Sequence, residues 1–324
     1  MVRRMVAGKR SGSDGDADDE EFKSWIDRFI HYAALQFVAS DVLPIPEWMD
    51  WSGHKKVMMR LSKDLDSIIT KSVEEHRERK TSGEGKGDED FIDVLLSVVD
   101  PDKFPDHDPD TIVKATALTV IIGGTDTLAV TMSITLSFLL NNPHVLKRAQ
   151  EELDIHVGKD RNADESDVKS LVYLQSIVKE SMRLSSLATF IPLRETSEDC
   201  RIGGFHVPPG TCVLVASGKV HRDPRLWSDP LAFKPERFLE ERVGVDVRGQ
   251  HFELVPFGAG RRSCPGISFA LQVMHLTLAR LLHGFEMARP SDAPMDVESL
   301  MVGNPKAPAV DVLLSPRLPR QLYE

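Results

Sequence analysis

The sequence predicts a mainly α-helical protein with a small β region, an α+β class. Most of the 324 residues lie in segments with apolar residues at helical spacing. The long segment 117–140 is apolar, with Asp126 as its one charged residue. Short β-prone runs separated by Gly-Gly and Pro-Pro-Gly turns occur mainly within 194–218. We expect these segments to form one domain over residues 1–324.

The expected elements follow one another along the chain in six segments. A long helix opens at Asp110 and is ended by "NNP" at 141–143. The segments are 1–109 (early helices and linkers, including helices over 54–80 and 91–100 and a linker over 81–90), 110–142 (the long helix), 143–193 (further helices, over 144–158 and 172–184), 194–218 (the β region), 219–285 (a turn-rich meander, a cysteine loop and a final helix) and 286–324 (a C-terminal β and loop segment).

Composition excludes several classes of protein. The net charge of −10 argues against non-specific nucleic-acid binding. The three cysteines are odd in number and form no C-x-x-C, which argues against a disulfide framework, a zinc finger or an iron–sulfur cluster and fits a reducing compartment. The N-terminal "MVRRMVAGKR" has no apolar core typical of a signal peptide.

The apolar segment 117–140 is long enough for a membrane span. Its five threonines, two serines and two glycines instead favour a helix buried in a soluble core. Gly123 and Gly124 weaken that helix at its centre, and Asp126 places a carboxylate there. Such a combination is unexpected in a purely structural helix.

"PFGAGRRSCPGISFA" (256–270) places Cys264 where a glycine-rich loop meets the final helix, 265–285. Pro265 suits the first helical position, and the helix is apolar nearly all round and is expected to be buried. The free N–H groups of a helix start and the preceding Arg261 and Arg262 favour a thiolate. A buried structural cysteine and a thiolate metal ligand beside an anionic cofactor both fit these residues.

Four motifs identify a resemblance. F-x-x-G-x-R-x-C-x-G occurs at Phe257–Gly266, E-x-x-R at Glu180 and Arg183, "PERF" at 235–238, and "GGTDT" at 123–127. In their order along the chain, with "GGTDT" first, then E-x-x-R, then "PERF" and the cysteine motif last, they resemble the cytochrome P-450 haem-thiolate monooxygenases. The chain is most similar to plant microsomal members that oxidise alkaloids, flavonoids and terpenoids.

The resemblance implies a cytochrome P-450 fold and a role for each matching residue. Cys264 would be the axial thiolate ligand of haem b, and Arg262 and Arg194 would pair with its propionates. Phe257 would pack near the thiolate, with Gly260 and Gly266 giving close backbone approach. A buried ion network of Glu180, Arg183 and Arg237 would fix the cysteine loop.

The long helix would form the oxygen side of the same site. Gly123 and Gly124 would let haem and O₂ approach the backbone, with a local widening of the helix. Thr127 would hydrogen-bond the oxygen or a water beside it, and Asp126 would connect that water to bulk protons. The expected substrate contacts are Thr119, Ile122, Ala188, Phe190 and Ile191.

The implied activity is insertion of one oxygen atom from O₂ into a small lipophilic plant metabolite. Electrons would come from NADPH through an NADPH-cytochrome reductase, on the cytosolic face of the endoplasmic reticulum membrane. Relatives carry a further N-terminal third with a membrane anchor, so the chain is expected to be an N-terminally truncated form of the fold. Two alternatives stay open: an inactive fragment, which would be cytoplasmic if it begins at Met1, and a peroxidase-like or isomerase-like haem protein that needs no reductase.

Overall fold

The structure is a computed structural model that describes residues 2–8, 24–26, 28–29, 32, 53–82, 89–187, 189–300 and 310–323. It divides into two compact units, Met1–Asp126 and Thr127–Glu324. The boundary between them falls inside helix α6 (Pro109–Asn141), so each unit is described by itself. The expectation of one domain over 1–324 stays a prediction.

The first unit contains α1 (Val2–Ala7), α4 (His54–Ser82), α5 (Phe91–Val98), a 3-10 helix (Pro101–Lys103) and the start of α6. Helix α4 is amphipathic because Leu61, Leu65, Ile69 and Val73 recur every fourth residue, and all four are buried. The helices predicted over 54–80 and 91–100 are therefore confirmed. Of the predicted linker over 81–90, residues 83–88 lie outside the described residues.

Helix α6 is unbroken from Pro109 to Asn141, as the sequence predicts for 110–142. The expected widening at Gly123 and Gly124 is wrong, because the α-helix continues through both glycines. The Thr125 hydroxyl donates to the Ile121 carbonyl at 2.7 Å, and the Thr131 hydroxyl donates to the Thr127 carbonyl at 2.7 Å. The first of these hydrogen bonds spans both glycines, and the second lies in the part of the helix that follows them.

The burial expected for α6 is also wrong over its middle. Among the described helices, α6 is the one long and apolar enough to cross a membrane, yet 22% of its most apolar 18-residue window is buried. Core helices of soluble proteins meet the same criterion of length and composition, so this is a weak indication of a span. Its second half supplies Leu128 and Leu139 to the core of the second unit.

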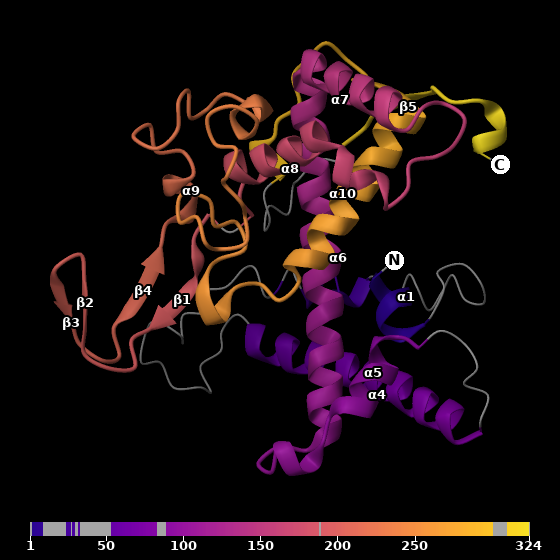
Figure 1. The fold of residues 1–324 in the computed structure, drawn as a ribbon. Coiled ribbons are helices and arrows are strands. Elements are labelled where there is room, and N and C mark those ends of the chain that lie inside the picture. Colours follow the sequence, from indigo (N-terminus) through magenta and orange to yellow (C-terminus); the bar gives the residue numbers. More distant parts are fainter. Residues whose placement is uncertain are drawn as a thin grey trace. The chain divides into compact units, whose positions relative to one another are not determined.

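The second unit is built around α7 (Pro143–His156), α8 (Val172–Leu184) and α10 (Ile267–Gly284), which pack side by side (Figure 1). Their apolar faces form one core with the turn-rich segment, which contributes Trp227, Phe233 and Phe238. Short elements complete the unit: α9 (Ser217–Val220) and the 3-10 helices Asp167–Ser170, Pro235–Phe238, Gly260–Arg262, Glu298–Leu300 and Arg320–Leu322.

Within the described residues, three antiparallel strand pairs form the β portion: β1 (Ile191–Glu195) with β4 (Cys212–Val215), β2 (Cys200–Ile202) with β3 (Phe205–Val207), and β5 (Phe285–Ala288) with β6 (Leu313–Pro316). The β2–β3 hairpin turns at Gly203 and Gly204, both with positive φ, as a two-residue hairpin requires. The β region begins at Ile191, three residues before the prediction, because Ile191 pairs with Val215. The predicted class, mainly α with a small β region, is confirmed.

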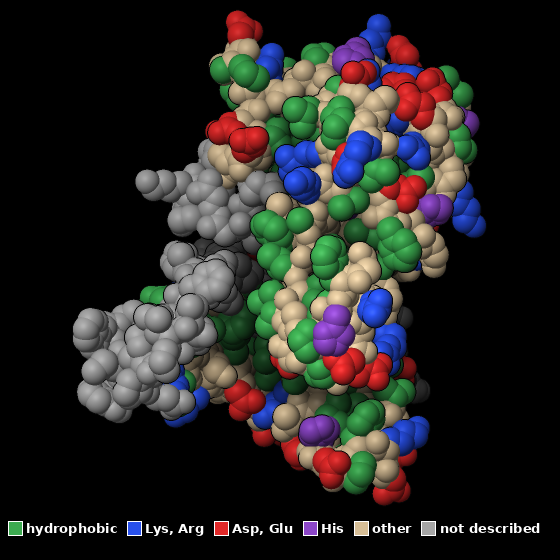
Figure 2. Space-filling view, turned by 90° about the vertical axis from the view of Figure 1, so that its left-hand side faces the viewer, with side chains coloured by type: hydrophobic (Ala, Val, Ile, Leu, Met, Phe, Trp, Pro, Cys, Tyr) green, Lys and Arg blue, Asp and Glu red, His purple; other side chains and the backbone are tan. Residues whose placement is uncertain are grey.

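The final helix differs from the prediction at its start. It begins at Ile267 with Gly266 as its N-cap, so Pro265 is outside it. Its buried residues lie between Leu271 and Gly284, on part of its surface rather than all round, and its first turn is not buried. On the face shown in Figure 2, acidic and basic side chains are interspersed with apolar ones.

Candidate functional site

The backbone of the cysteine loop is held by a series of short turns. The Gly258 N–H donates to the Val255 carbonyl at 3.0 Å, and the Ser263 N–H donates to the Gly260 carbonyl at 3.1 Å. The Cys264 N–H then closes the loop by donating to the Phe257 carbonyl at 2.9 Å. Gly258 and Gly260 have φ of +73° and +71°, which a residue with a side chain adopts only with strain. Gly258 and Gly260 therefore set the path of the chain around Cys264.

Cys264 itself is a free, exposed cysteine. The prediction that it stands at a helix N-terminus is corrected, since α10 begins three residues later and Gly266 is its N-cap. A Cβ at Gly266 would lie 3.7 Å from the Cys264 Sγ. Glycine thus leaves the sulfur open on that side, which fits a thiolate that must reach a metal.

A further glycine that the motif does not contain supports this loop. Gly249 has φ of +87°, and a Cβ there would meet the Gly258 carbonyl oxygen and the Ala259 Cα, both at 3.1 Å. The backbone of the meander therefore lies directly against the cysteine loop. The sequence carried no signal for this contact, because an isolated glycine in a turn-rich segment is common.

The two predicted propionate partners lie close together. The Arg194 guanidinium, on β1, donates to the Arg262 carbonyl at 3.4 Å. The exposed Arg262 side chain forms no hydrogen bond or ion pair with the described residues. Phe257 is half-buried and packs against the core. An unpaired guanidinium beside an open thiol, with an aromatic ring behind the loop, fits an anionic iron cofactor.

The structure brings Glu180, Arg183 and Arg237 together in the core, all at 3% exposure or less. Arg183 is bidentate on the Glu180 carboxylate, with Nε and Nη2 at 2.8 and 2.9 Å from its two oxygens. Arg237 Nε donates to Oε1 at 3.0 Å, and the Lys234 N–H donates to the same oxygen at 2.9 Å. The carboxylate is therefore fully hydrogen-bonded, as a buried charge requires.

The remaining guanidinium N–H groups of this network donate hydrogen bonds to backbone carbonyls of the meander. Arg183 Nη1 donates to the carbonyls of His221 and Pro230, each at 2.8 Å. Arg237 Nη1 donates to the Ser228 carbonyl at 2.8 Å. The indole of Trp227 lies beneath the Arg183 guanidinium, 5.2 Å from it. These contacts attach helix α8 to a segment roughly fifty residues later in the chain.

Sequence reasoning missed His221, the residue after α9. It is fully buried, and its Nε2 accepts the Val255 N–H at 2.9 Å, two residues before Phe257. Burial together with the nearby Arg183 and Arg222 lowers the pKa of His221 to about 4. A histidine in a polar, turn-rich segment gives no signal of burial, so only the fold locates it.

The residues predicted for the oxygen side lie on α6. Asp126 is half-buried, Gly124 is half-buried, and Gly123 and Thr127 are exposed. A Cβ at Gly123 would meet no atom within 4 Å, so this glycine leaves open space beside the helix. The carboxylate predicted to be buried at Asp126 is therefore only partly buried.

The predicted substrate contacts fall in two places. On α6, Thr119 is exposed, with its hydroxyl donating to the Ala115 carbonyl at 2.7 Å, and Ile122 is half-buried. Phe190 is exposed, and Ile191 is half-buried at the start of β1. Ala188 lies outside the described residues.

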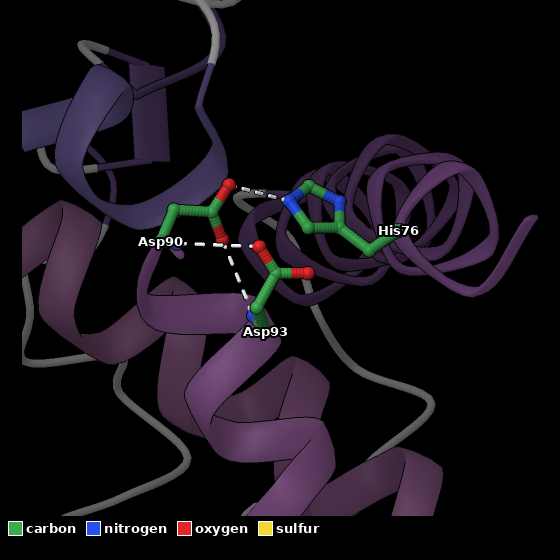
Figure 3. Close-up of side chains that lie close together, drawn as sticks. All are labelled: His76, Asp90 and Asp93. Carbon is green, nitrogen blue, oxygen red and sulfur yellow. Dashed lines mark hydrogen bonds and ion pairs between the residues drawn. The ribbon is translucent and has the colours of Figure 1, made fainter. Parts of the chain in front are cut away.

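A second polar cluster, in the first unit, has the composition of a metal site (Figure 3). His76, Asp90 and Asp93 bring possible ligand atoms within 4.8 Å of one another. Asp90 is the N-cap of α5: its Oδ1 accepts the Ile92 and Asp93 N–H groups at 3.0 and 3.2 Å, and Asp93 accepts the Asp90 N–H in return.

The histidine of this cluster is fully engaged as well. Its Nδ1 lies 2.6 Å from the Ser72 carbonyl and its Nε2 lies 2.6 Å from Asp90 Oδ2. Both ring nitrogens are thus already in hydrogen-bonding contact with oxygen atoms. The cluster is therefore a capped helix start hydrogen-bonded to His76, and we assign no metal to it.

Comparison with known proteins resolves the family. The family model described as Cytochrome P450 matches residues 1–310. The chain belongs to the cytochrome P450 family. Membership of this family implies a cofactor of the haem-thiolate type. The recognition made from the four motifs is confirmed.

Several plant enzymes are similar to the chain over its whole length. The chain is 50% identical to a flavonoid-6-hydroxylase of Ocimum basilicum, with 100% of this chain and 61% of that protein covered. It is 45% identical to a strychnine-10-hydroxylase of Strychnos nux-vomica (100% and 62% covered) and 46% identical to a protopine 6-monooxygenase of Eschscholzia californica (100% and 63% covered). The chain therefore spans somewhat less than two thirds of these relatives' length.

A solved structure supports the fold. The zebra fish cytochrome P450 determined with abiraterone superposes with a TM-score of 0.78 at 27% identity, over 98% of this chain and 69% of that chain. The helical architecture of the present chain is thus that of a cytochrome P450.

Proposed function

We propose that this cytochrome P450 is a monooxygenase that inserts one oxygen atom from O₂ into a small lipophilic plant metabolite. The observation that carries the proposal is the open, unpaired Cys264 in a loop whose backbone is closed by its own N–H. Cys264 would hold the haem iron, Arg262 and Arg194 its propionates, and Phe257 its proximal side. A bound haem-thiolate group supplies the activation of O₂.

The other residues act around that group. Glu180, Arg183 and Arg237 hold the meander, which supports the cysteine loop through Gly249 and Val255. On α6, the Thr127 hydroxyl orients a proton-bearing water, and Asp126, the preceding residue, passes protons from solvent. Gly123 and Gly124 keep side chains away from the helix surface where oxygen and substrate would bind.

The relatives favour a polycyclic substrate. Their names describe hydroxylation of a flavonoid, of strychnine and of protopine. We place this chain's substrate among flavonoids and alkaloids, ahead of terpenoids, with Thr119, Ile122, Ala188, Phe190 and Ile191 as contacts. Electrons would come from NADPH through a reductase at the cytosolic face of the endoplasmic reticulum membrane, as in the microsomal members that the sequence resembles.

The first test is the spectrum of the reduced, carbon monoxide-bound protein after haem loading. Wild type should give the absorption band of a thiolate-ligated haem. Cys264→Ser should lose this band, while Cys212→Ser should keep it, because Cys212 is an equally exposed free cysteine outside the loop. A wild-type protein that binds haem without the thiolate band would refute the assignment of Cys264.

A second test addresses α6. With a reductase and a flavonoid substrate, Thr127→Ala should raise the fraction of NADPH that yields peroxide instead of product. Thr125→Ala, two residues away and also exposed, is the matched control and should leave the ratio unchanged. Binding of haem with no NADPH-dependent product in the wild type would instead support the inactive-fragment alternative.

A further inference from the structure

His221 joins two parts of the molecule that are otherwise separate in sequence. Its backbone carbonyl accepts a hydrogen bond from Arg183 Nη1 at 2.8 Å, and its ring Nε2 accepts the Val255 N–H at 2.9 Å. The first bond belongs to the buried Glu180 network. The second holds Val255, the residue at which the meander passes into the cysteine loop.

The chemistry of this contact fixes the tautomer. A backbone N–H can only donate, so Nε2 carries the lone pair and the proton of the neutral ring is on Nδ1. Nδ1 is buried and has no hydrogen-bond partner in the described part of the chain. A buried donor without a partner is unfavourable, so this ring orientation is not explained by the satisfaction of Nδ1. The bond that the orientation secures is the one to Val255.

From Val255 the hydrogen bonds continue to the cysteine. The Val255 carbonyl accepts the Gly258 N–H at 3.0 Å, and the Phe257 carbonyl accepts the Cys264 N–H at 2.9 Å. An unbroken series of contacts thus leads from Arg183 through His221 and the start of the loop to the backbone of Cys264. Leu254 and Val255 are themselves buried, which leaves this start of the loop little freedom.

We propose that His221 is a positioning residue, whose ring nitrogen acceptor holds the Val255 amide and so transmits the rigidity of the Glu180–Arg183 network to the cysteine loop. The inference rests on the proposed role of Cys264 as the thiolate ligand. It goes further by assigning a role to a residue outside all four motifs. The ring must stay neutral for this purpose, and burial, together with the two cations Arg183 and Arg222, lowers its pKa and keeps it so.

Two substitutions test whether an acceptor at the position of Nε2 is required, or whether any polar side chain at residue 221 is enough. The Gln side chain is one methylene longer than Asn and reaches the position of the ring Nε2, whereas Asn reaches only the position of Nδ1. His221→Gln should therefore accept the Val255 N–H and His221→Asn should not. Both replacements are neutral amides of similar polarity.

The experiment measures two quantities in each variant. Hydrogen exchange of the Val255 amide, in the chain before haem loading, should be near wild type in His221→Gln and faster by about tenfold in His221→Asn. After haem loading, the fraction of carbon monoxide complex with the thiolate band should be retained in the Gln variant and reduced in the Asn variant. Equal behaviour of the two variants in either measurement would overturn the proposal.

A third measurement does not depend on how the variants fold. Nitrogen NMR of His221 in the wild-type chain should show a proton on Nδ1 and an unprotonated Nε2. The opposite tautomer would overturn the proposal directly. Cys264→Ser distinguishes the two levels of inference: it should lose the thiolate band and keep the slow exchange of Val255. Absence of the thiolate band in wild type, with slow hydrogen exchange at the Val255 amide, would refute the role of Cys264 but not the contact made by His221.

Discussion

Two buried carboxylates, Glu180 in the second unit and Asp90 in the first, are satisfied in opposite ways. Glu180 accepts from two guanidinium groups and from the backbone of Lys234, fifty-four residues away. Asp90 accepts from the first turn of its own helix and from His76, fourteen residues away. Asp90 mainly caps the start of its own helix, α5, whereas Glu180 joins helix α8 to the meander.

The comparison separates two uses of a buried charge. A cap stabilises one helix by about 0.5–2 kcal/mol, and its loss is felt locally. A buried ion pair adds little net stability over apolar packing, but removal of one partner leaves an uncompensated charge and costs about 3–5 kcal/mol. We therefore infer that Glu180 contributes mainly to specificity: it defines one arrangement of the segments that carry the cysteine loop.

The largest effect is expected for Arg183→Met. The substitution leaves the Glu180 carboxylate with Arg237 as its one cation and frees the His221 and Pro230 carbonyls in the core. The free energy of unfolding should fall by about 3–5 kcal/mol, as measured by urea denaturation. A loss below about 1 kcal/mol would contradict the view that this network joins the meander to α8.

The next largest effect is a pH dependence carried by His221. Its pKa is lowered to about 4 in the folded chain from 6.5, so below pH 6.5 the unfolded state binds more protons. Stability is therefore fully present above pH 6.5 and is lost as the pH falls toward 4. The total is about 3 kcal/mol.

The measurement is the difference between wild type and His221→Gln in the free energy of unfolding, followed from pH 7.5 to 4.5 or so by urea denaturation. The Gln variant lacks the titrating ring, so the difference between the two proteins should shrink or reverse as the pH falls. His275, whose pKa is also lowered to about 4, is present in both proteins and cancels from the comparison. Parallel curves would show that His221 contributes no such dependence.

A smaller loss is expected in the first unit for Asp90→Ala. The change removes the N-cap of α5 and the carboxylate opposite His76, at about 2 kcal/mol. Asp93→Ala is the control, since it removes only the reciprocal hydrogen bond to the Asp90 N–H, and should lose less than about 1 kcal/mol. Equal losses would mean that the contact between His76 and Asp90 adds nothing to the free energy of unfolding.

The smallest effect is expected for Arg77→Met. Arg77 is bidentate on Asp110 through Nη1 and Nη2, whereas Arg183 is bidentate on Glu180 through Nε and Nη2. Both partners of the Arg77 pair are nearly half exposed. Solvent screening limits the contribution of such a pair to about 0.2–1 kcal/mol. The same urea titration used for Arg183→Met makes this the matched comparison of one ion pair in two environments. A loss as large as that of Arg183→Met would remove burial as the explanation.

Local patterns predicted the helices well. Helix α8 matches its predicted bounds, 172–184, because apolar residues recur at helical spacing along this segment. The glycines at 258 and 260 likewise announced a tight loop, since only glycine adopts the positive φ found there. The errors lie at the ends of elements: β1 begins at Ile191, which pairs with Val215 of β4, and α10 begins at Ile267, after the turn in which the Cys264 N–H donates to the Phe257 carbonyl.

By itself the sequence determined the order of the elements, the family and the chemistry available at Cys264, because these follow from residue types at fixed spacings. It also named Glu180, Arg183 and Arg237 as partners, through motifs that occur together. Only the tertiary structure decided that His221 is buried against Val255 and that Gly249 lies against the cysteine loop. The reason is physical: such contacts join segments whose separation along the chain carries no period, so burial and hydrogen-bond geometry, rather than local pattern, select them.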